Sequence, residues 1–516
     1  MYHRAPFCER ARNTFYYTQR LDGRLSPALL GPASMFIFMR NQVQLITYVD
    51  RFGGGDIAAL QALLAGPLKG VFGGVHLLPF FDPIDGADAG FDPTNHTRVD
   101  PRLGDWTDVS KLAQTLPVMA DVIVNHMSCE SPQFKHVIAH GKKSECAELF
   151  LTLDKVFPNG TNEESLLHVY RPRPGLPLTY VVLANGEKRI FWTTFTAKQI
   201  DIDVESEQGS RYLDGILDAL SGASVTMVRL DAVGYAIKRA GRDCFMMPET
   251  FAFIEQFAAR AAARSLEVLV EVHSYFQKQI EVAKQVAWVY DFALPPLVLH
   301  AIFNRTPEAL GRWIAMRPTN AITVLDTHDG IGIIDIGADA TDRAARPGLV
   351  PPAALDKLVE TIHQNSGGQS REATGAAASN LDLYQVNCTF YDALGRDDAA
   401  YLLARAVQFF LPGIPQVYYV GLLAGENDMA LLARTGVGRD INRHHFTPSE
   451  IVDALKKPVV LQLIALIKLR NTHPAFNGEF SHRVDGDALM LRWQSAGAFV
   501  QLDVDFSTLT HAVSQG

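Results

Sequence analysis

The sequence contains few cysteines, no long apolar run and no surplus of positive charge. Its five cysteines are scattered along 516 residues and include no C-x-x-C pair. This argues against a disulfide scaffold and against a zinc site, and it favours a reducing compartment such as the cytoplasm. No stretch of about 18 apolar residues occurs, so no membrane span is expected. A formal net charge of −9 without a long basic block argues against a general nucleic-acid or anionic-membrane binder.

Residues 1–38 differ in composition from the rest of the chain. They carry five arginines against two acidic residues and end in the apolar patch 35–38. They lack the compact apolar region and small-residue cleavage site of a clear signal peptide. We expect Met39 to be the natural start and residues 1–38 to be an N-terminal extension outside the fold, with a transit-like leader as the alternative.

Eight short apolar runs alternate with segments of helical periodicity. Buried parallel strands read as continuous apolar runs, and their alternation with helices indicates βαβ units. The count of eight predicts an α/β fold of the (β/α)8 TIM-barrel type. A doubly wound open sheet is the alternative, although no G-x-G-x-x-G follows the first run. The runs are residues 43–49, 74–81, 118–125, 227–233, 268–273, 288–294, 321–326 and 415–420.

Two intervals between the runs are longer than ordinary barrel connections. Residues 127–200, after the third run, are long enough for an inserted domain B, and residues 330–398, after the seventh, read as a long-loop insertion rich in Gly, Ala and Ser. The barrel would then consist of residues 39–126 and 201–476. Alternating apolar residues beyond this point predict a short C-terminal β region over residues 477–516.

Polar residues stand at or after the ends of most predicted strands. In a barrel these positions meet at the C-terminal face, where active sites lie. A single such residue has an ordinary structural explanation, as a buried ion pair or a hydrogen-bonded core histidine. A ring of them predicts one polar pocket, because buried charges are costly unless paired. In chain order they are Asp88, Asn125, His126, Arg229, Asp231, Glu271, His273, Asp326, His328, Asp329, Arg439 and Asp440, and the apolar Phe91 lies in the same exit loop as Asp88.

Three carboxylates, Asp231, Glu271 and Asp329, head this pocket. Glycoside chemistry uses paired carboxylates on either side of a bond, one ionised as nucleophile and one protonated as acid. Residues i and i+2 of a strand share a face, so Arg229 is predicted to lie beside Asp231 and to keep it ionised by lowering its pKa. Glu271 lies in an apolar stretch, which predicts a raised pKa and a protonated acid.

Motifs at the strand ends carry a resemblance to a known family. With V-N-H at the third run, V-R-L-D-A-V-G-Y at the fourth, L-V-E-V-H-S at the fifth and V-L-D-T-H-D-G at the seventh, the chain resembles the α-amylase clan of retaining glycosidases and transglycosidases. Within that clan it is similar to the sucrose phosphorylases over residues 39–476. Stretches that match them almost verbatim include G-V-H-L-L-P-F-F, G-A-D-A-G-F-D-P, Y-R-P-R-P-G-L-P, G-A-A-A-S-N-L-D-L-Y-Q-V-N and G-R-D-I-N-R-H. The C-terminal region looks shorter than the β domain usual in that family.

The resemblance implies a role for most of these polar residues and for several others. Asp231 would be the nucleophile that forms a β-glucosyl-enzyme, Glu271 the acid and later the base, and Asp329 the stabiliser of the transition state. Asp88 and Arg439 would hold the far side of the glucose unit. The other residues of the glucose subsite would be Phe91, His126, Phe195, Arg229 and His328. Those of the acceptor subsite would be Tyr170, Pro172, Arg173, Tyr235, His273, Leu381, Asp382, Tyr384 and Gln385.

The resemblance also implies the substrates. They would be sucrose and inorganic phosphate, with α-D-glucose 1-phosphate and D-fructose as products, transglucosylation as a side activity, and no cofactor or metal. A related phosphorylase of sucrose 6'-phosphate, glucosylglycerol or glucosylglycerate is the alternative. A plain hydrolase also stays open, whereas a non-catalytic binding barrel would be expected to lack one of the three carboxylates. We expect a cytoplasmic protein without nucleic-acid or membrane partners, and a homodimer is one open assembly.

His136 and His140 stand four residues apart on a predicted helix, a spacing that suits a metal ion. No neighbouring carboxylate completes a set of three ligands in the sequence pattern. We therefore interpret this segment as a surface helix without a metal.

Overall fold

The computed structural model describes residues 41–86, 88–170, 175–339, 342–375 and 385–516. The predicted extension, residues 1–38, lies outside this part of the chain. Five predicted site residues also lie outside it, namely Pro172, Arg173, Leu381, Asp382 and Tyr384.

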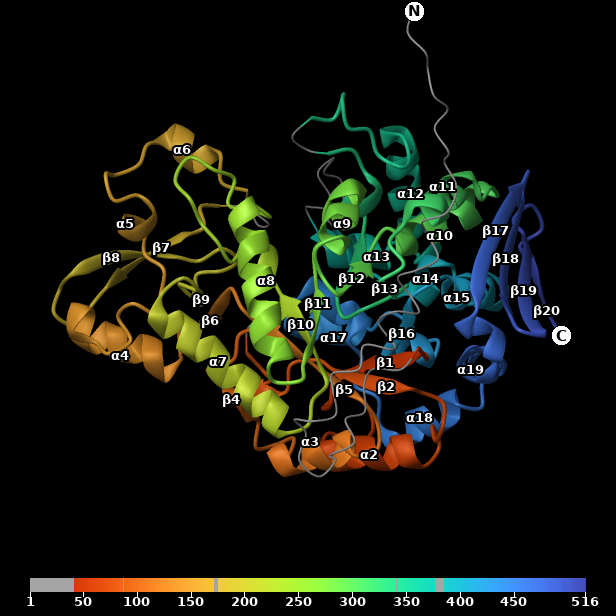
Figure 1. The fold of residues 1–516 in the computed structure, drawn as a ribbon, viewed down its shortest axis with the longest axis horizontal. Helices are drawn as coiled ribbons and strands as arrows, with labels where there is room; N and C mark the ends of the chain where they lie inside the picture. The colour runs from red at the N-terminus through yellow and green to blue at the C-terminus, as the bar shows by residue number, and fades with distance from the viewer. Residues whose placement is uncertain (1–40, 87, 171–174, 340–341, 376–384) are drawn as a thin grey trace, which may run out of the picture. The chain divides into compact units, whose positions relative to one another are not determined.

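The described chain is built around a closed barrel of eight parallel strands (Figure 1). The order around the barrel is β1-β16-β13-β12-β11-β10-β5-β2, so strands that follow one another along the chain lie side by side. Each strand coincides with one of the eight apolar runs, and the (β/α)8 prediction is confirmed. The strands are β1 (Gln44–Thr47), β2 (Gly74–Leu77), β5 (Val118–Ile123), β10 (Met227–Asp231), β11 (Glu267–Val270), β12 (Trp288–Asp291), β13 (Ala321–Thr323) and β16 (Ile414–Tyr418).

Helices connect the barrel strands and cover their outer faces (Figure 1). Several begin at a side chain that accepts a hydrogen bond from the first turn, as an N-cap requires. The Asp56 carboxylate accepts from the Ala59 N–H at 2.7 Å, and the Ser206 hydroxyl accepts from the Gly209 N–H at 2.9 Å. The helices are α2 (Ile57–Ala65), α3 (Trp106–Ala113), α7 (Glu207–Gly222), α8 (Pro248–Ala262), α9 (Phe276–Ala283), α10 (Leu294–Asn304), α11 (Glu308–Met316), α15 (Asp398–Phe410), α16 (Tyr419–Leu422), α17 (Met429–Thr435), α18 (Pro448–Ala454) and α19 (Pro458–Thr472).

The segment after the third barrel strand contains elements of its own. Two antiparallel strand pairs, β6–β9 and β7–β8, are accompanied by three short α-helices and one 3-10 helix. Leu151, Phe157, Val169 and Trp192 form a small separate core there, together with Cys244 from the loop after β10. The elements are β6 (His126–Ser128), α4 (Pro132–His140), η2 (Gly141–Lys143), α5 (Leu153–Val156), α6 (Glu163–Leu167), β7 (Leu178–Val182), β8 (Lys188–Trp192) and β9 (Gln199–Asp201).

The segment after the seventh barrel strand is more regular than its composition predicts. Instead of loops alone, it contains a 14-residue helix, α12 (Pro352–Asn365), with Leu358 and Ile362 on its buried side. A two-stranded antiparallel pair closes the segment near the barrel mouth. The pair consists of β14 (Ile331–Gly332) and β15 (Gln385–Val386). The further elements are η4 (Ile334–Ile336), α13 (Gln369–Thr374) and α14 (Phe390–Ala393).

The C-terminal residues form a four-stranded antiparallel sheet that packs on α15. Leu489, Leu491 and Trp493 alternate toward the buried face, which is the period of two that the sequence shows. The Trp493 indole N–H donates to the Phe410 carbonyl at 2.7 Å, so the sheet is tied to the end of that helix. The strands are β17 (Glu479–Asp485), β18 (Ala488–Ser495), β19 (Ala498–Asp505) and β20 (Thr510–Gln515).

Among the described residues, no helix combines the length and the apolar character that crossing a membrane would require.

Candidate active site

The C-terminal ends of the barrel strands surround one pocket of about 170 Å³. It lies where the sequence pattern places the polar ring, because the strand ends of a barrel converge on one face. The predicted site residues that line it are Asp88, Phe91, His126, Phe195, Asp231, Tyr235, Glu271, His273, His328, Asp329 and Arg439.

Three polar residues of the predicted ring are engaged in structural contacts. Asn125 accepts a hydrogen bond from the Lys238 ammonium at 2.7 Å, and Asp326 accepts one from Arg405 at 2.6 Å. Asp440 lies 3.6 Å from the Arg443 guanidinium. For these residues the ordinary explanation, a buried paired group, is the correct one.

Arg229 lies beneath the pocket and joins the carboxylates. It is 2% exposed, and its Nη1 forms an ion pair with Asp121 in the barrel interior. The same nitrogen is 3.2 Å from Asp231 Oδ1, and its Nη2 is 2.5 Å from Glu271 Oε1. The Arg229 guanidinium therefore contacts the pocket carboxylates Asp231 and Glu271 and also Asp121 below them. Its planar group carries several N–H donors, which makes these simultaneous contacts possible.

The pKa of Asp231 differs from the sequence prediction. Burial, followed by the neighbouring Glu271 carboxylate, raises the pKa of Asp231 well above its usual range, and the lowering by Arg229 does not offset these effects. Glu271 does not sit in apolar surroundings, because it is paired with Arg229. The prediction that Arg229 keeps Asp231 ionised by lowering its pKa is therefore wrong, because burial and the adjacent carboxylate have the larger effect.

Asp329 is ionised by its surroundings. Burial alone would raise its pKa, but Arg439, followed by His328, His273 and Arg443, holds the pKa well below its usual range. The Arg439 Nη1 lies 2.8 Å from Asp329 Oδ1. Burial lowers the pKa of His328 to about 3, so this ring is neutral and can hydrogen-bond a hydroxyl. The pocket thus combines a carboxylate with a lowered pKa, Asp329, and a carboxylate with a raised pKa, Asp231.

His273 stands between the carboxylates and the acceptor side. Its Nδ1 is 3.0 Å from Asp335, its Nε2 is 4.0 Å from Glu271 Oε1, and its ring stacks on Phe292. Burial lowers its pKa, but the Asp335 charge and hydrogen bond dominate and raise it overall. The Gln385 amide lies 3.5 Å from His273 Nε2, which brings this predicted residue to the pocket edge. Sequence reasoning missed Asp335, which lies in an unpatterned stretch after β14.

Aromatic rings form the pocket walls on two sides. The Phe91 ring stacks on His328 with centroids 4.6 Å apart, and the Phe195 ring lies 5.2 Å from that of His126. His126 is fixed by contacts of its Nε2 with the Phe91 carbonyl at 3.0 Å and with Gln199 at 3.1 Å. Flat apolar faces beside hydrogen-bonding groups suit a sugar ring, which has both kinds of surface.

A cluster of three aromatic residues adjoins Phe195, whose ring centroid lies 5.2 Å from that of Tyr235. Tyr170 and Tyr235 are stacked with centroids 6.1 Å apart, and Phe245 lies 4.8 Å from each of them. Phe245 lines the pocket but was missed by sequence reasoning. Its only signal was its place in the loop after β10, where Ala232 has a left-handed φ of 55° that turns the chain sharply after Asp231.

Glu271, His273 and Asp329 place possible metal-ligand atoms within 4.8 Å of one another. The Arg229 and Arg439 guanidiniums, however, already neutralise the two carboxylates. This arrangement of paired acids, guanidiniums and aromatic walls suits a neutral, hydroxyl-rich ligand better than a cation. The fold and this site together define an enzyme of the α-amylase class, with its acidic residues at the C-terminal ends of a (β/α)8 barrel.

Comparisons with known proteins agree with this class. The α-amylase catalytic-domain model matches residues 69–291. The chain is 60% identical to a sucrose phosphorylase of Agrobacterium vitis over 470 residues, covering 91% of this chain and 96% of the relative. It is 56% identical to a sucrose phosphorylase of Bifidobacterium adolescentis over 457 residues, covering 88% and 90%. The crystal structure of a sucrose 6F-phosphate phosphorylase from Thermoanaerobacter thermosaccharolyticum matches with a TM-score of 0.85 at 37% identity, over 94% of this chain and 98% of that one. The chain belongs to the sucrose phosphorylase family, and it is a glycosyltransferase.

Proposed function

We propose that this enzyme catalyses the reversible phosphorolysis of sucrose to α-D-glucose 1-phosphate and D-fructose, by two displacements at the anomeric carbon. The observation that carries the proposal is the pair of pocket carboxylates Asp231 and Glu271, both in contact with Arg229. Two neighbouring carboxyl groups can supply the nucleophile and the acid of a retaining reaction. Membership of the family supports the choice of substrate.

In the first displacement, a carboxylate oxygen of Asp231 attacks the anomeric carbon of the glucosyl unit. The bond from that carbon to the fructosyl oxygen breaks, and Glu271 gives its proton to the leaving oxygen. Asp231 must therefore be ionised and Glu271 protonated at the moment of attack. Arg229 lies beside both groups, so the pair keeps one negative charge and one guanidinium partner throughout.

In the second displacement, Glu271 accepts a proton from phosphate while a phosphate oxygen attacks the anomeric carbon of the β-glucosyl-enzyme. The ester to Asp231 breaks, and two inversions leave the product in the α configuration. Asp329, held ionised beside Arg439, stabilises the positive charge that develops on the sugar ring in both steps. We assign Asp88 and Arg439 to the far side of the glucose unit.

The acceptor side must bind fructose in one half-reaction and phosphate in the other. His273, whose pKa is raised by Asp335 against burial, places its Nε2 4.0 Å from Glu271 Oε1 on this side. Arg173 provides a guanidinium that can bind phosphate bidentately. Replacing Arg173 should weaken the use of phosphate more than glucosyl transfer to neutral acceptors, and equal loss of both would contradict this role.

The test is incubation of the purified protein with sucrose and inorganic phosphate, with the products followed by ³¹P and ¹H NMR. We expect α-D-glucose 1-phosphate and fructose in equal amounts. A parallel reaction without phosphate measures hydrolysis, and Asp356→Asn, on the exposed face of α12, serves as a variant control. Free glucose as the sole product, or no turnover of sucrose, would refute the proposal.

A second candidate is phosphorolysis of a related glucoside. The solved relative at 37% identity is a sucrose 6F-phosphate phosphorylase, so barrels of this kind serve more than one substrate. Sucrose 6'-phosphate, glucosylglycerol and glucosylglycerate should be offered beside sucrose, each with phosphate. We expect the highest kcat/KM with sucrose, and a higher value with any of the others would transfer the assignment to that substrate.

A further inference from the structure

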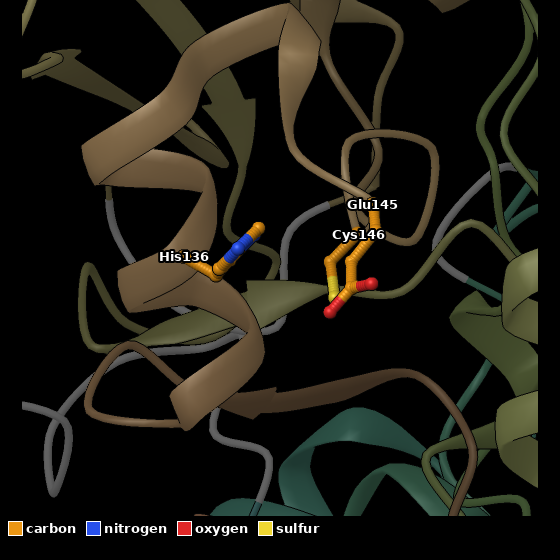
Figure 2. Close-up of side chains that lie close together, drawn as sticks. All are labelled: His136, Glu145 and Cys146. Carbon is orange, nitrogen blue, oxygen red and sulfur yellow. The ribbon is translucent and has the colours of Figure 1, made fainter.

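The segment inserted after the third barrel strand brings together a histidine, a glutamate and a cysteine. His136 projects from α4, and Glu145 and Cys146 lie on the loop that follows it (Figure 2). One possible ligand atom from each lies within 4.8 Å of the others. The sequence interpretation that no carboxylate joins this helix is therefore wrong, because the chain reverses after η2 and returns Glu145 to His136. None of the three residues lines the pocket.

The distances between the possible ligand atoms can be compared with those in a zinc centre. Zn²⁺ binds imidazole nitrogen, thiolate sulfur and carboxylate oxygen at about 2.0–2.3 Å, which places neighbouring ligand atoms about 3.5 Å apart. The ligand atoms, within 4.8 Å of one another, must therefore come closer together when an ion binds. Glu145 is exposed, and His136 and Cys146 are half-buried, so their side chains can turn toward a common point.

The Ser144 hydroxyl forms hydrogen bonds with two residues of the cluster. Its hydroxyl lies 2.8 Å from His136 Nδ1 and accepts a hydrogen bond from the Cys146 backbone N–H at 3.0 Å. When Nδ1–H donates to this hydroxyl, the lone pair of His136 Nε2 is left for a metal ion. A ligating histidine whose second nitrogen is held by a hydrogen bond is a regular feature of protein metal centres.

We propose that His136, Glu145 and Cys146 form a structural zinc site that ties helix α4 to the loop after it. The mixed nitrogen, sulfur and oxygen donors suit a borderline-soft divalent ion and argue against Ca²⁺ or Mg²⁺, which take oxygen donors. Binding forms a bond from sulfur to zinc and releases the thiol proton to water.

The neighbouring His140 is one turn further along α4, with its ring centroid 4.4 Å from that of His136. It is exposed and stands on the solvent side, where the fourth position of a tetrahedral ion would be completed by water or by this ring. Because the folded segment holds the ligands together and the unfolded chain does not, zinc should raise the unfolding temperature.

The test uses the full-length protein after treatment with EDTA. Zn²⁺ is titrated in competition with a chelating dye, and Co²⁺ is added separately to detect the charge-transfer absorption of a sulfur–cobalt bond. We expect one equivalent of Zn²⁺ to bind and to raise the unfolding temperature. Cys146→Ser and His136→Asn should each weaken binding at least tenfold, and Cys146→Ser should abolish the charge-transfer band. Ser144→Ala should weaken binding about tenfold through the loss of orientation.

Cys129→Ser is the matched control. Cys129 is also half-buried and lies 3.8 Å from the Glu130 carboxylate, but it belongs to no three-ligand cluster among the described residues. This variant should bind Zn²⁺ and Co²⁺ as the unmodified protein does. Sucrose phosphorolysis, or circular dichroism, verifies that each variant is folded. Unchanged zinc affinity in Cys146→Ser, or loss of binding in Cys129→Ser, would overturn the site.

Discussion

At the scale of single residues, Arg229 organises the site. It is buried, and it contacts Asp121 below the pocket and both Asp231 and Glu271 at its floor. With His76 it lowers the pKa of Asp121, but it does not offset the effects of burial and of the Glu271 carboxylate on Asp231. The pKa of Asp231 therefore stays above its usual range.

Removal of each member of the pair should have a distinct stereochemical consequence. Asp231→Ala should reduce kcat at least about 10³-fold, because no covalent intermediate forms. With sucrose and added azide, it should yield β-glucosyl azide by a single inversion. Glu271→Ala still forms the β-glucosyl-enzyme slowly and should yield α-glucosyl azide. The anomeric configuration is read by ¹H NMR, and exchanged configurations would reverse the two roles.

Asp121 should contribute to stability in a pH-dependent way. Burial would raise its pKa, but Arg229 and His76 lower it to about 2, below its ordinary value of 3.8. Its ionised form therefore stabilises the fold above that ordinary value, and the contribution is lost as pH falls toward 2. Asp121→Asn should lower the free energy of unfolding at neutral pH by about 3 kcal/mol, since it leaves a buried charge underpaired.

Denaturant unfolding at several pH values checks this prediction. The difference between the unmodified protein and Asp121→Asn should shrink below about pH 4. Asp356→Asn, on the solvent side of α12, is the control and should change stability by less than about 0.5 kcal/mol. A constant difference across the pH range would show that Asp121 does not act through its charge.

At the scale of secondary-structure elements, the sequence pattern predicted the barrel strands well. It did not predict the helices and strands inside the two insertions. Each strand is a short run buried on both faces, so its apolar composition identifies it without knowledge of its neighbours. Helix α12 was read as loop, because its segment as a whole is rich in Gly, Ala and Ser. The pairing of β6 with β9 joins residues about 70 positions apart along the chain, which no local period reveals.

The C-terminal sheet should stabilise the barrel through one residue in particular. Trp493 is buried against Phe476 and Phe480 and donates to the carbonyl at the end of α15. Trp493→Ala should lower the free energy of unfolding by about 3–5 kcal/mol, because it leaves a cavity and an unpaired carbonyl group. The kcat for sucrose should stay within about twofold below the unfolding temperature, since the sheet contributes no residue to the pocket.

Urea unfolding and steady-state kinetics on the same preparation check this separation of stability from activity. Leu461→Ala, on the exposed side of α19, is the comparison variant and should be close to neutral. A large loss of kcat in a folded Trp493→Ala protein would mean that the sheet influences the pocket.

At the scale of the whole molecule, the described fold is anchored from residue 41 onward. The Arg470 guanidinium donates to the Asn41 side chain at 2.6 Å, and the Asn471 side chain accepts from the Val43 backbone N–H at 2.7 Å. The last barrel helix thereby fastens the start of the first strand. The predicted boundary at Met39 lies just before this anchor.

A chain that begins at Met39 should therefore fold and react as the full chain does. We expect its unfolding temperature to stay within about 2 °C, since about 1 kcal/mol shifts the unfolding temperature of larger domains by only a few degrees. Its kcat for sucrose should stay within about twofold. Calorimetry and kinetics on both chains check this, and a markedly less stable or inactive shorter chain would place residues 1–38 within the functional unit.

The sequence by itself determined the barrel, the ring of polar strand ends and the three carboxylates, because each is written in a short local pattern of apolar runs and motifs. Only the tertiary structure decided which of those polar groups meet. In the folded chain, Asn125 and Asp326 are paired with Lys238 and Arg405. Phe245 lines the pocket, and Asp335 contacts His273 at the pocket. Glu145 and Cys146 lie close to His136. The physical reason is that pKa values and metal-ligand sets depend on distances between segments far apart in the chain, and only the folded chain brings those segments together.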